Sequence, residues 1–189
     1  WERFQRVRED LRKRGITIPY VHAANTPATV FFPDAHLDLV RVGLGIYGMY
    51  PDARRPLDLK PALTLKTKVA FVKRVPAGSC VSYNSTYVTD REPSLAVLPI
   101  GYADGLSRGL SNRGHVIIKG TFCPIVGNVT MDHTMVDVRD LPCVIGDEVI
   151  LLGTDGRHEI QAHHWANLLG TINYEITCML SSRIERVYL

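Results

Sequence analysis

The sequence has 189 residues, 46% of them hydrophobic and 22% charged, with a formal net charge of +3. This composition is typical of a globular protein with one ordinary domain, or one small domain and part of another. The Lys and Arg residues are scattered except in the run Arg3–Arg14, which we interpret as the solvated face of a helix whose apolar face carries Trp1, Phe4, Val7 and Leu11. A nucleic-acid-binding protein would show a denser basic stripe. No apolar run approaches the ~18 residues of a membrane span, and no signal-peptide pattern opens the sequence. Because the sequence starts with Trp1 inside this helix, we expect a cleaved or truncated product.

The cysteine and histidine residues show no metal-binding pattern. The four cysteines lie far apart and include no Cys-x-x-Cys pair, so we predict reduced, mostly buried thiols in a cytoplasmic protein. The histidines His158, His163 and His164 are interpreted as surface residues. We therefore predict no metal site.

Residues 1–57 alternate between helical and strand patterns. The first helix runs through Leu11 and ends at Gly15, a residue type that commonly ends helices. A buried strand is predicted over Ile16–Ala23, a helix start at Thr26-Pro27, and a second strand over Leu37–Val42. Helices and strands that alternate in this way indicate parallel strands.

A proline-rich stretch, Tyr50–Leu63, reads as a linker because Pro51, Pro56 and Pro61 fall within it together with charged residues. We therefore predict two domains, residues 1–57 and 58–189. The second domain shows short alternating segments separated by turn residues, which predicts an antiparallel β domain. Its expected elements are strands within Leu63–Val75, Leu95–Ile100, His115–Lys119, Phe122–Val126, Thr134–Val138 and Glu148–Leu152, a helix over Ala162–Leu169, and a last strand near Arg183–Leu189.

Two loops in the first domain each follow a predicted strand and open a helix. They contain Asn25-Thr26 and Arg41-Val42-Gly43-Leu44-Gly45. Exposed backbone N–H groups at helix starts bind phosphate, and glycines let the backbone approach closely. Two such neighbouring loops match the phosphate site that (β/α)8 barrels form after strands seven and eight. From spacing alone the glycines could equally make tight turns, and Arg41 could equally form a surface salt bridge.

Four segments, in this order, resemble the later part of a pyridoxal-phosphate-dependent alanine racemase. They are Tyr20-Val21-His22-Ala23-Ala24-Asn25-Thr26, Arg41-Val42-Gly43-Leu44-Gly45-Ile46-Tyr47-Gly48, Ser82-Tyr83-Asn84-Ser85-Thr86-Tyr87 and Val129-Thr130-Met131-Asp132. The resemblance spans nearly the whole chain. It implies an α/β fragment, formed by the last strands and helices of a (β/α)8 barrel, followed by a mainly antiparallel β domain.

The resemblance also implies an activity. The parent enzyme would be a cytoplasmic homodimer that interconverts L- and D-alanine, with no nucleic-acid or membrane partner. Its cofactor lysine would lie upstream of this sequence, because the lysines that are present match no family motif. We therefore expect the fragment to be inactive alone.

The cofactor, pyridoxal 5'-phosphate, would contact residues from both domains. The resemblance assigns the Thr26 hydroxyl, the backbone amides of Gly43 and Leu44, and Tyr174 to the phosphate, and Arg41 to the pyridine nitrogen. A guanidinium keeps its charge at working pH, so Arg41 would oppose protonation of the ring nitrogen and weaken the cofactor as an electron sink.

Tyr87 matches the second catalytic base of the family. A tyrosine has a reference pKa of ~10, so it needs a neighbouring cation or a hydrogen-bond network to act as a base. Asn84 stands where the family usually has glycine, and asparagine tolerates positive φ, so the turn can survive. Without the resemblance, Tyr83 and Tyr87 would be interpreted as core packing.

The substrate would be contacted by Tyr102, Met131 and Asp132, with Arg108 at the mouth of the channel. Asn128 stands where the family commonly has arginine, which leaves the charge of the channel open.

Three alternatives remain at the level of sequence. A racemase for serine or for a broad range of amino acids would carry the same motifs. A fold-related decarboxylase fits less well, because those enzymes lack the paired Ser-Tyr-x-x-Thr-Tyr and Thr-Met-Asp motifs. A non-catalytic β module for association or ligand binding is compatible with the residue patterns alone.

Overall fold

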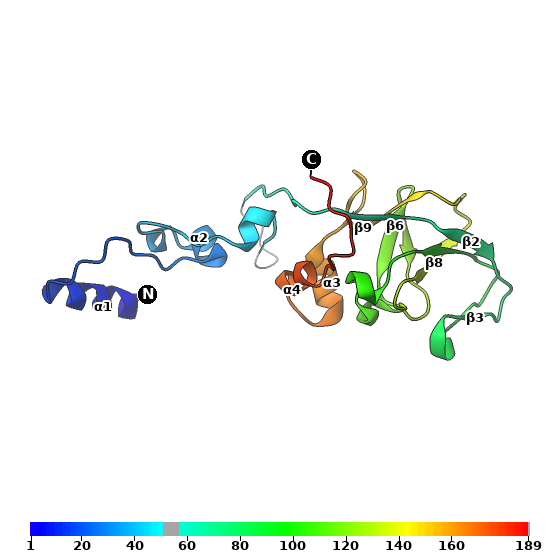
Figure 1. The fold of residues 1–189 in the computed structure, drawn as a ribbon, viewed down its shortest axis with the longest axis horizontal. Coiled ribbons are helices and arrows are strands. Elements are labelled where there is room, and N and C mark those ends of the chain that lie inside the picture. The colour runs from blue at the N-terminus through cyan, green and yellow to red at the C-terminus, as the bar shows by residue number, and fades with distance from the viewer. Residues whose placement is uncertain (51–56, 189) are drawn as a thin grey trace. The chain divides into compact units, whose positions relative to one another are not determined.

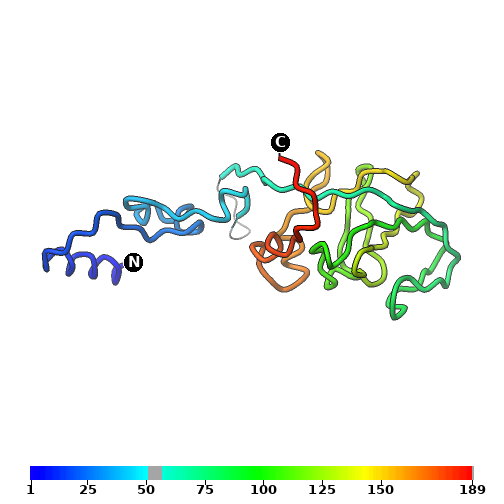
Figure 2. Tube along the Cα trace, in the orientation of Figure 1, coloured from blue at the N-terminus to red at the C-terminus, as the bar shows by residue number. Residues whose placement is uncertain are grey.

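The computed structural model describes residues 1–50 and 57–188, traced from blue to red in Figures 1 and 2. The chain divides into two units, Trp1–Lys60 and Pro61–Leu189. The middle of the predicted linker, including Pro51 and Pro56, lies outside the described residues, as does Leu189. Across the described ranges, no helix is long and apolar enough to cross a membrane.

The first unit contains the predicted helices. Its elements are α1 (Glu2–Lys13), α2 (Thr26–Phe31) and the 3-10 turns η1 (Pro33–Ala35) and η2 (Leu44–Tyr47). Helix α1 ends just before Gly15, whose φ of 72° lies in the left-handed region that glycine adopts without strain. Helix α2 begins after Asn25, whose side-chain Oδ1 accepts a hydrogen bond from the N–H of Ala28 at 3.1 Å, and Pro27 occupies its first turn.

The two strands predicted in this unit are wrong as drawn from sequence. Residues 16–23 and 37–42 form no strand: they are irregular, with a turn at 37–38. The Asp38 N–H donates to the Val21 carbonyl at 3.1 Å, and one parallel bridge joins Asn25 to Arg41. Ile16 and Ile18 are about half exposed rather than buried. A parallel strand needs hydrogen-bond partners along its edges and a cover on each face, and the described residues of this unit offer one bridge.

The second unit is antiparallel throughout its described pairings. One sheet has the order β1-β9-β6-β7 with β10 beside β9, a second has the order β2-β5-β8, and β3 and β4 form a hairpin. The strands are β1 (Leu65–Lys68), β2 (Phe71–Arg74), β3 (Cys80–Val81), β4 (Tyr87–Val88), β5 (Ser94–Leu98), β6 (His115–Ile118), β7 (Thr121–Pro124), β8 (Thr134–Arg139), β9 (Glu148–Thr154) and β10 (Glu159–Ile160).

Most predicted elements of this unit are confirmed within a few residues, and helix α3 (Ala162–Leu169) has the predicted bounds. Helix α4 (Asn173–Cys178) was not predicted. The last predicted strand is wrong, because residues 183–188 form no strand; this segment instead runs past the sheets, in red in Figures 1 and 2.

The core of the unit lies between the sheets. Leu98, Ile118, Val136 and Leu151 are fully buried, and they come from β5, β6, β8 and β9. An isolated bridge between Ile125 and Val136 links the end of β7 to β8. This framework fixes the starts of the loops that carry the predicted site residues.

Candidate active site

In the first unit, a turn brings Thr26 against the glycine-rich loop. The Thr26 side chain is buried, and its Oγ1 accepts hydrogen bonds from the N–H of Gly43 at 3.1 Å and of Gly45 at 3.5 Å. A Cβ at Gly45 would lie 3.0 Å from Val42 Cγ1 and 3.2 Å from Thr26 Cγ2, so a larger residue would crowd this contact. The two loops that sequence spacing placed together therefore meet.

Arg41 is held at the start of the same loop. Its backbone N–H donates to the Ala24 carbonyl at 2.8 Å, and its guanidinium Nη2 donates to the Ala23 carbonyl at 3.1 Å. The side chain is exposed and forms no ion pair with any residue of the described ranges. The surface salt bridge considered from sequence is thus not seen among these residues.

These residues have the donor chemistry that a phosphate and a pyridine nitrogen require. Thr26 Oγ1 already accepts from Gly43, so its hydroxyl proton can be donated to an anion. Leu44 is the first residue of η2 and its N–H has no partner within that turn. Nothing lies within 4 Å of a Cβ position built on Gly43, which leaves room beside this backbone. The residues present therefore fit the phosphate end of pyridoxal phosphate.

In the second unit, the segment 82–87 forms a tight loop between β3 and β4. Asn84 has φ 64° and ψ 9°, the left-handed conformation that a glycine would adopt most easily, and Ser82 and Ser85 also have positive φ. The predicted tolerance of asparagine at this turn is confirmed. Gly127 lies against the loop, because a Cβ there would be 2.6 Å from the Val81 carbonyl oxygen.

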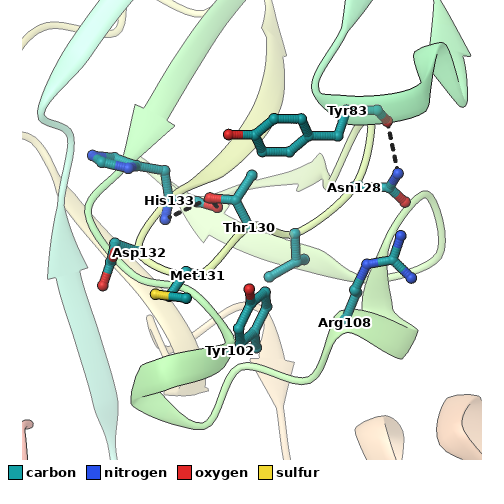
Figure 3. A pocket seen from close by; sticks show the side chains of 9 residues that line it. Tyr83, Tyr102, Arg108, Asn128, Thr130, Met131, Asp132 and His133 are labelled. Carbon is teal, nitrogen blue, oxygen red and sulfur yellow. Dashed lines mark hydrogen bonds between the residues drawn. The ribbon is translucent and has the colours of Figure 1, made fainter.

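A pocket of about 560 Å³ lies beside this loop (Figure 3). It collects four predicted substrate-side residues, which come from η4 (Tyr102–Asp104), η5 (Arg108–Leu110) and the loop before β8. Its lining residues are Tyr83, Tyr102, Arg108, Asn128, Val129, Thr130, Met131, Asp132 and His133. Predicted substrate contacts that are far apart in sequence thus share one cavity.

Asn128 makes a structural contact at the wall of this pocket. Its side chain is buried, and Nδ2 donates to the Tyr83 carbonyl at 2.7 Å, while the Asn128 carbonyl accepts from Ser82 Oγ at 2.7 Å. These two bonds join the 82–87 loop to the 127–133 loop. The positive charge that the family commonly has at this position is replaced by a loop-to-loop hydrogen bond, so Arg108 remains the cation among the lining residues.

Tyr87 lies outside the residues that line the pocket. It is half-buried on β4 and packs against Val81, Leu95 and Val126. Burial, with smaller contributions from the negative charges of Asp137 and Asp90, raises its pKa above the ordinary value. Within this unit the environment therefore holds the tyrosine in its protonated form, and a base would need a cation from elsewhere.

Tyr174 lies on α4 and is 40% exposed, so its ring is available for a contact outside this unit. Tyr83, Thr130 and His133 line the pocket although they were not assigned a role from sequence. Each is a neighbour of a motif residue, which is the signal that could have found them. Arg183 also contacts a pocket residue, Asp132, and nothing in the local sequence pointed to it.

The fold, the loops around Thr26 and Gly43, and the pocket beside Tyr102 and Met131 are those of one class of protein, in which the end of a (β/α)8 barrel is followed by an antiparallel β domain. Comparison with known families agrees. The family described as alanine racemase, C-terminal domain, matches residues 62–188, and the family described as alanine racemase, N-terminal domain, matches residues 1–51. The chain belongs to the alanine racemase family.

Known relatives give the same picture. The chain is 50% identical to the alanine racemase of Carboxydothermus hydrogenoformans, covering 99% of this chain and 52% of that protein, and 46% identical to that of Halothermothrix orenii, covering 100% and 50%. The crystal structure of alanine racemase from the D-cycloserine producer Streptomyces lavendulae matches with a TM-score of 0.93 and 42% identity, over 98% of this chain and 50% of that one. The alanine racemase of Clostridium difficile 630 in complex with cycloserine matches with a TM-score of 0.91 and 39% identity, over 98% and 50%. The chain thus spans about half the length of the relatives it matches.

Proposed function

We propose that this chain forms the C-terminal half of a pyridoxal-phosphate-dependent alanine racemase, with Tyr87 as one of two catalytic bases. The observation that carries the proposal is the match of both racemase domain families, in order, along the chain. The relatives are named alanine racemases, which favours alanine over serine or a broad range of amino acids and favours an enzyme over a non-catalytic β module.

The cofactor would be held by Thr26, Gly43, Leu44 and Tyr174 at its phosphate and by Arg41 at its pyridine nitrogen. Support comes from the Thr26 hydroxyl, whose Oγ1 lies 3.1 Å from the Gly43 nitrogen and which can donate to an anion, and from the exposed side chain of Arg41. When bound, pyridoxal phosphate makes the α-proton of an amino acid acidic enough to be removed. The charged guanidinium would oppose protonation of the ring nitrogen and so limit how far this activation goes.

The tyrosine base must lose its proton to act. In this unit the pKa of Tyr87 is raised by burial, then by Asp137 and Asp90, so the assembled site has to supply positive charge close to its Oη. The proposed source is the cofactor-binding domain, which presents the charged Arg41. As the resemblance to alanine racemases implies, we propose that Tyr87 lies against the barrel of the partner subunit in a head-to-tail homodimer.

The pocket would receive the amino acid. Tyr102 and Met131 line it as the proposed substrate contacts, and Arg108 supplies the positive charge that attracts a carboxylate. Because Asn128 brings no charge, the channel carries less positive potential than one with an arginine at that position. The four cysteines are free, which supports a cytoplasmic enzyme, although the prediction that they are mostly buried is wrong, because Cys80 and Cys178 are exposed.

The test is a chimera in which this chain replaces the matching half of the C. hydrogenoformans alanine racemase. With pyridoxal phosphate, the chimera should convert L-alanine to D-alanine and the reverse. A folded, cofactor-loaded chimera that racemises serine but not alanine would overturn the substrate assignment, and one that racemises neither would overturn the proposed activity.

A further inference from the structure

The loops that carry Tyr102 and Met131 are fastened to each other by their backbones. The N–H of Tyr102 donates to the Thr130 carbonyl and the N–H of Ala103 to the Met131 carbonyl, both at 3.0 Å. A Cβ on Gly101 would lie 2.2 Å from the Thr130 oxygen, so the two chains touch there. The proposed substrate-contacting face of the pocket is therefore formed by two loops that are joined by their backbones.

Arg183 bridges the same two loops with its side chain. Its Nη2 donates to Asp132 Oδ1 at 2.8 Å, and its Nε lies 3.4 Å from Asp104 Oδ1. In Figure 3 the Asp132 carboxylate points away from the centre of the pocket. Asp132 is thus engaged by Arg183 rather than directed toward a ligand.

The segment around Arg183 is anchored to the Tyr102 turn as well. The N–H of Ser181 donates to the Asp104 carbonyl at 3.0 Å, and Asp104 Oδ2 accepts from the Gly101 N–H at 2.9 Å. The Asp104 side chain is only 12% exposed. Without a cation between them, two carboxylates on adjoining loops would repel each other and strain the contact between the loops.

We propose that Arg183 is a positioning residue that holds Tyr102 and Met131 in place on the substrate side of the pocket. The inference rests on the proposed racemase function. The hydrogen bond to Asp132 and then the charge of Asp104 raise the pKa of Arg183, in agreement with the geometry. Asp132 then acts through Arg183, and its proposed direct contact with substrate is replaced by an indirect one.

The ion pair between Arg183 and Asp132 is exposed, so its proposed role in positioning the loops can be distinguished from a role in stabilising the fold. The Arg183 side chain is 53% exposed, and exposed ion pairs contribute little to stability. A small displacement of a substrate-contacting group nevertheless lowers activity strongly, because reacting groups must be held in register. Arg183 should therefore affect substrate handling more than folding.

The test compares variants of the chimera described above. Arg183→Gln should raise the KM for alanine by about tenfold and leave kcat within about threefold, with Tm unchanged. Arg183→Lys keeps the charge without the planar fork and should restore part of the loss. Arg186→Gln is the matched control, because Arg186 is exposed and has no ion pair or hydrogen bond across the described residues. Asp132→Asn added to Arg183→Gln should recover part of the loss in KM, because it removes the repulsion between the two carboxylates that Arg183 no longer separates.

Amide hydrogen exchange gives a readout that does not need activity. Arg183→Gln should speed exchange at the N–H groups of Tyr102 and Ala103 and leave strand β9 unchanged. An active chimera in which Arg183→Gln matches Arg186→Gln in KM and in exchange would overturn the inference. A wild-type chimera without racemase activity would instead overturn the proposed function, and exchange at the two amides would still decide the positioning role.

Discussion

The buried thiol of Cys123 makes the stability of the β domain depend on alkaline pH. Cys123 lies on β7 with 1% of its surface exposed, and burial, reinforced by Cys143 and Asp137, raises its pKa from 9.0 to about 11. An unfolded chain would release this proton near the ordinary value. The contribution is therefore complete below about pH 9 and is lost as pH rises toward about 11.

The size of the loss follows from the shift. About two pKa units at about 1.36 kcal/mol each give about 3 kcal/mol in total, of which about 2 kcal/mol is lost between about pH 8 and pH 11. Other groups titrate in the same range, so the quantity to measure is a difference between proteins. We would measure the free energy of unfolding of wild type and of Cys123→Ala by urea titration under reducing conditions. Both values should fall as pH rises, and wild type should lose more by the amount due to Cys123.

Two features make this comparison decisive. The cavity left by Cys123→Ala is present at both pH values and cancels in the difference between them. Cys178→Ala, at an exposed cysteine, should show the same pH dependence as wild type. If the free energy of unfolding of wild type and of Cys123→Ala falls by the same amount between the two pH values, burial does not raise the pKa of the Cys123 thiol and the reasoning fails.

Further predictions concern the loops and the base. Gly101→Ala places a Cβ 2.2 Å from the Thr130 oxygen, so we expect a loss of roughly 1–3 kcal/mol in the urea unfolding free energy and a raised KM in the chimera; an unchanged KM would mean that this contact does not shape the pocket. Asp137→Asn removes the buried carboxylate that is bonded at 2.5 Å to Arg91, and should lower the free energy of unfolding by about 1–3 kcal/mol. The loss is limited because the partly exposed Arg91 side chain can be hydrated instead. The same change should lower the pKa of Tyr87, measured as the tyrosinate absorbance absent from a Tyr87→Phe counterpart, and an unaltered titration would exclude Asp137 as a neighbour that acts on the base.

The sequence predicted the β domain well because its strands are short apolar runs separated by turn residues. Thr134–Val138 and Glu148–Leu152 lie within strands that extend them by one or two residues, and each strand finds antiparallel partners inside the same unit. The short hairpin of β3 and β4 was not specified, because two-residue strands carry no period. Helix α4 was missed for a related reason: six residues are too few for a helical period to show.

The parallel strands show the opposite case. Ile16–Ala23 has the apolar content of a buried strand, yet its residues are mostly exposed in the described unit. Apolar content reports the burial that a segment is suited to, whereas strand formation also needs neighbours that supply hydrogen bonds. Local signals such as the helix start at Thr26-Pro27 and the helix end at Gly15 need no such neighbours, and both predictions are confirmed.

For the site, motifs predicted which residues meet but not how they are supported. Tyr102 and Met131 share a pocket as expected from two separate motifs. The arginine that joins their loops lies 51 residues beyond Asp132, in a segment predicted as a strand. A long-range ion pair of this kind leaves no periodic or local pattern, so only the folded structure reveals it.

The measurement that tests the central claim most directly is exchange of the α-proton of alanine with deuterated water, catalysed by the chimera and its Tyr87→Phe variant. Two bases on opposite faces predict that Tyr87→Phe lowers racemisation by about 10²–10⁴-fold while one enantiomer of alanine still exchanges its α-proton through the remaining base. If the variant racemises alanine in both directions at the wild-type rate, Tyr87 is not a catalytic base and the account of this half of the enzyme is contradicted.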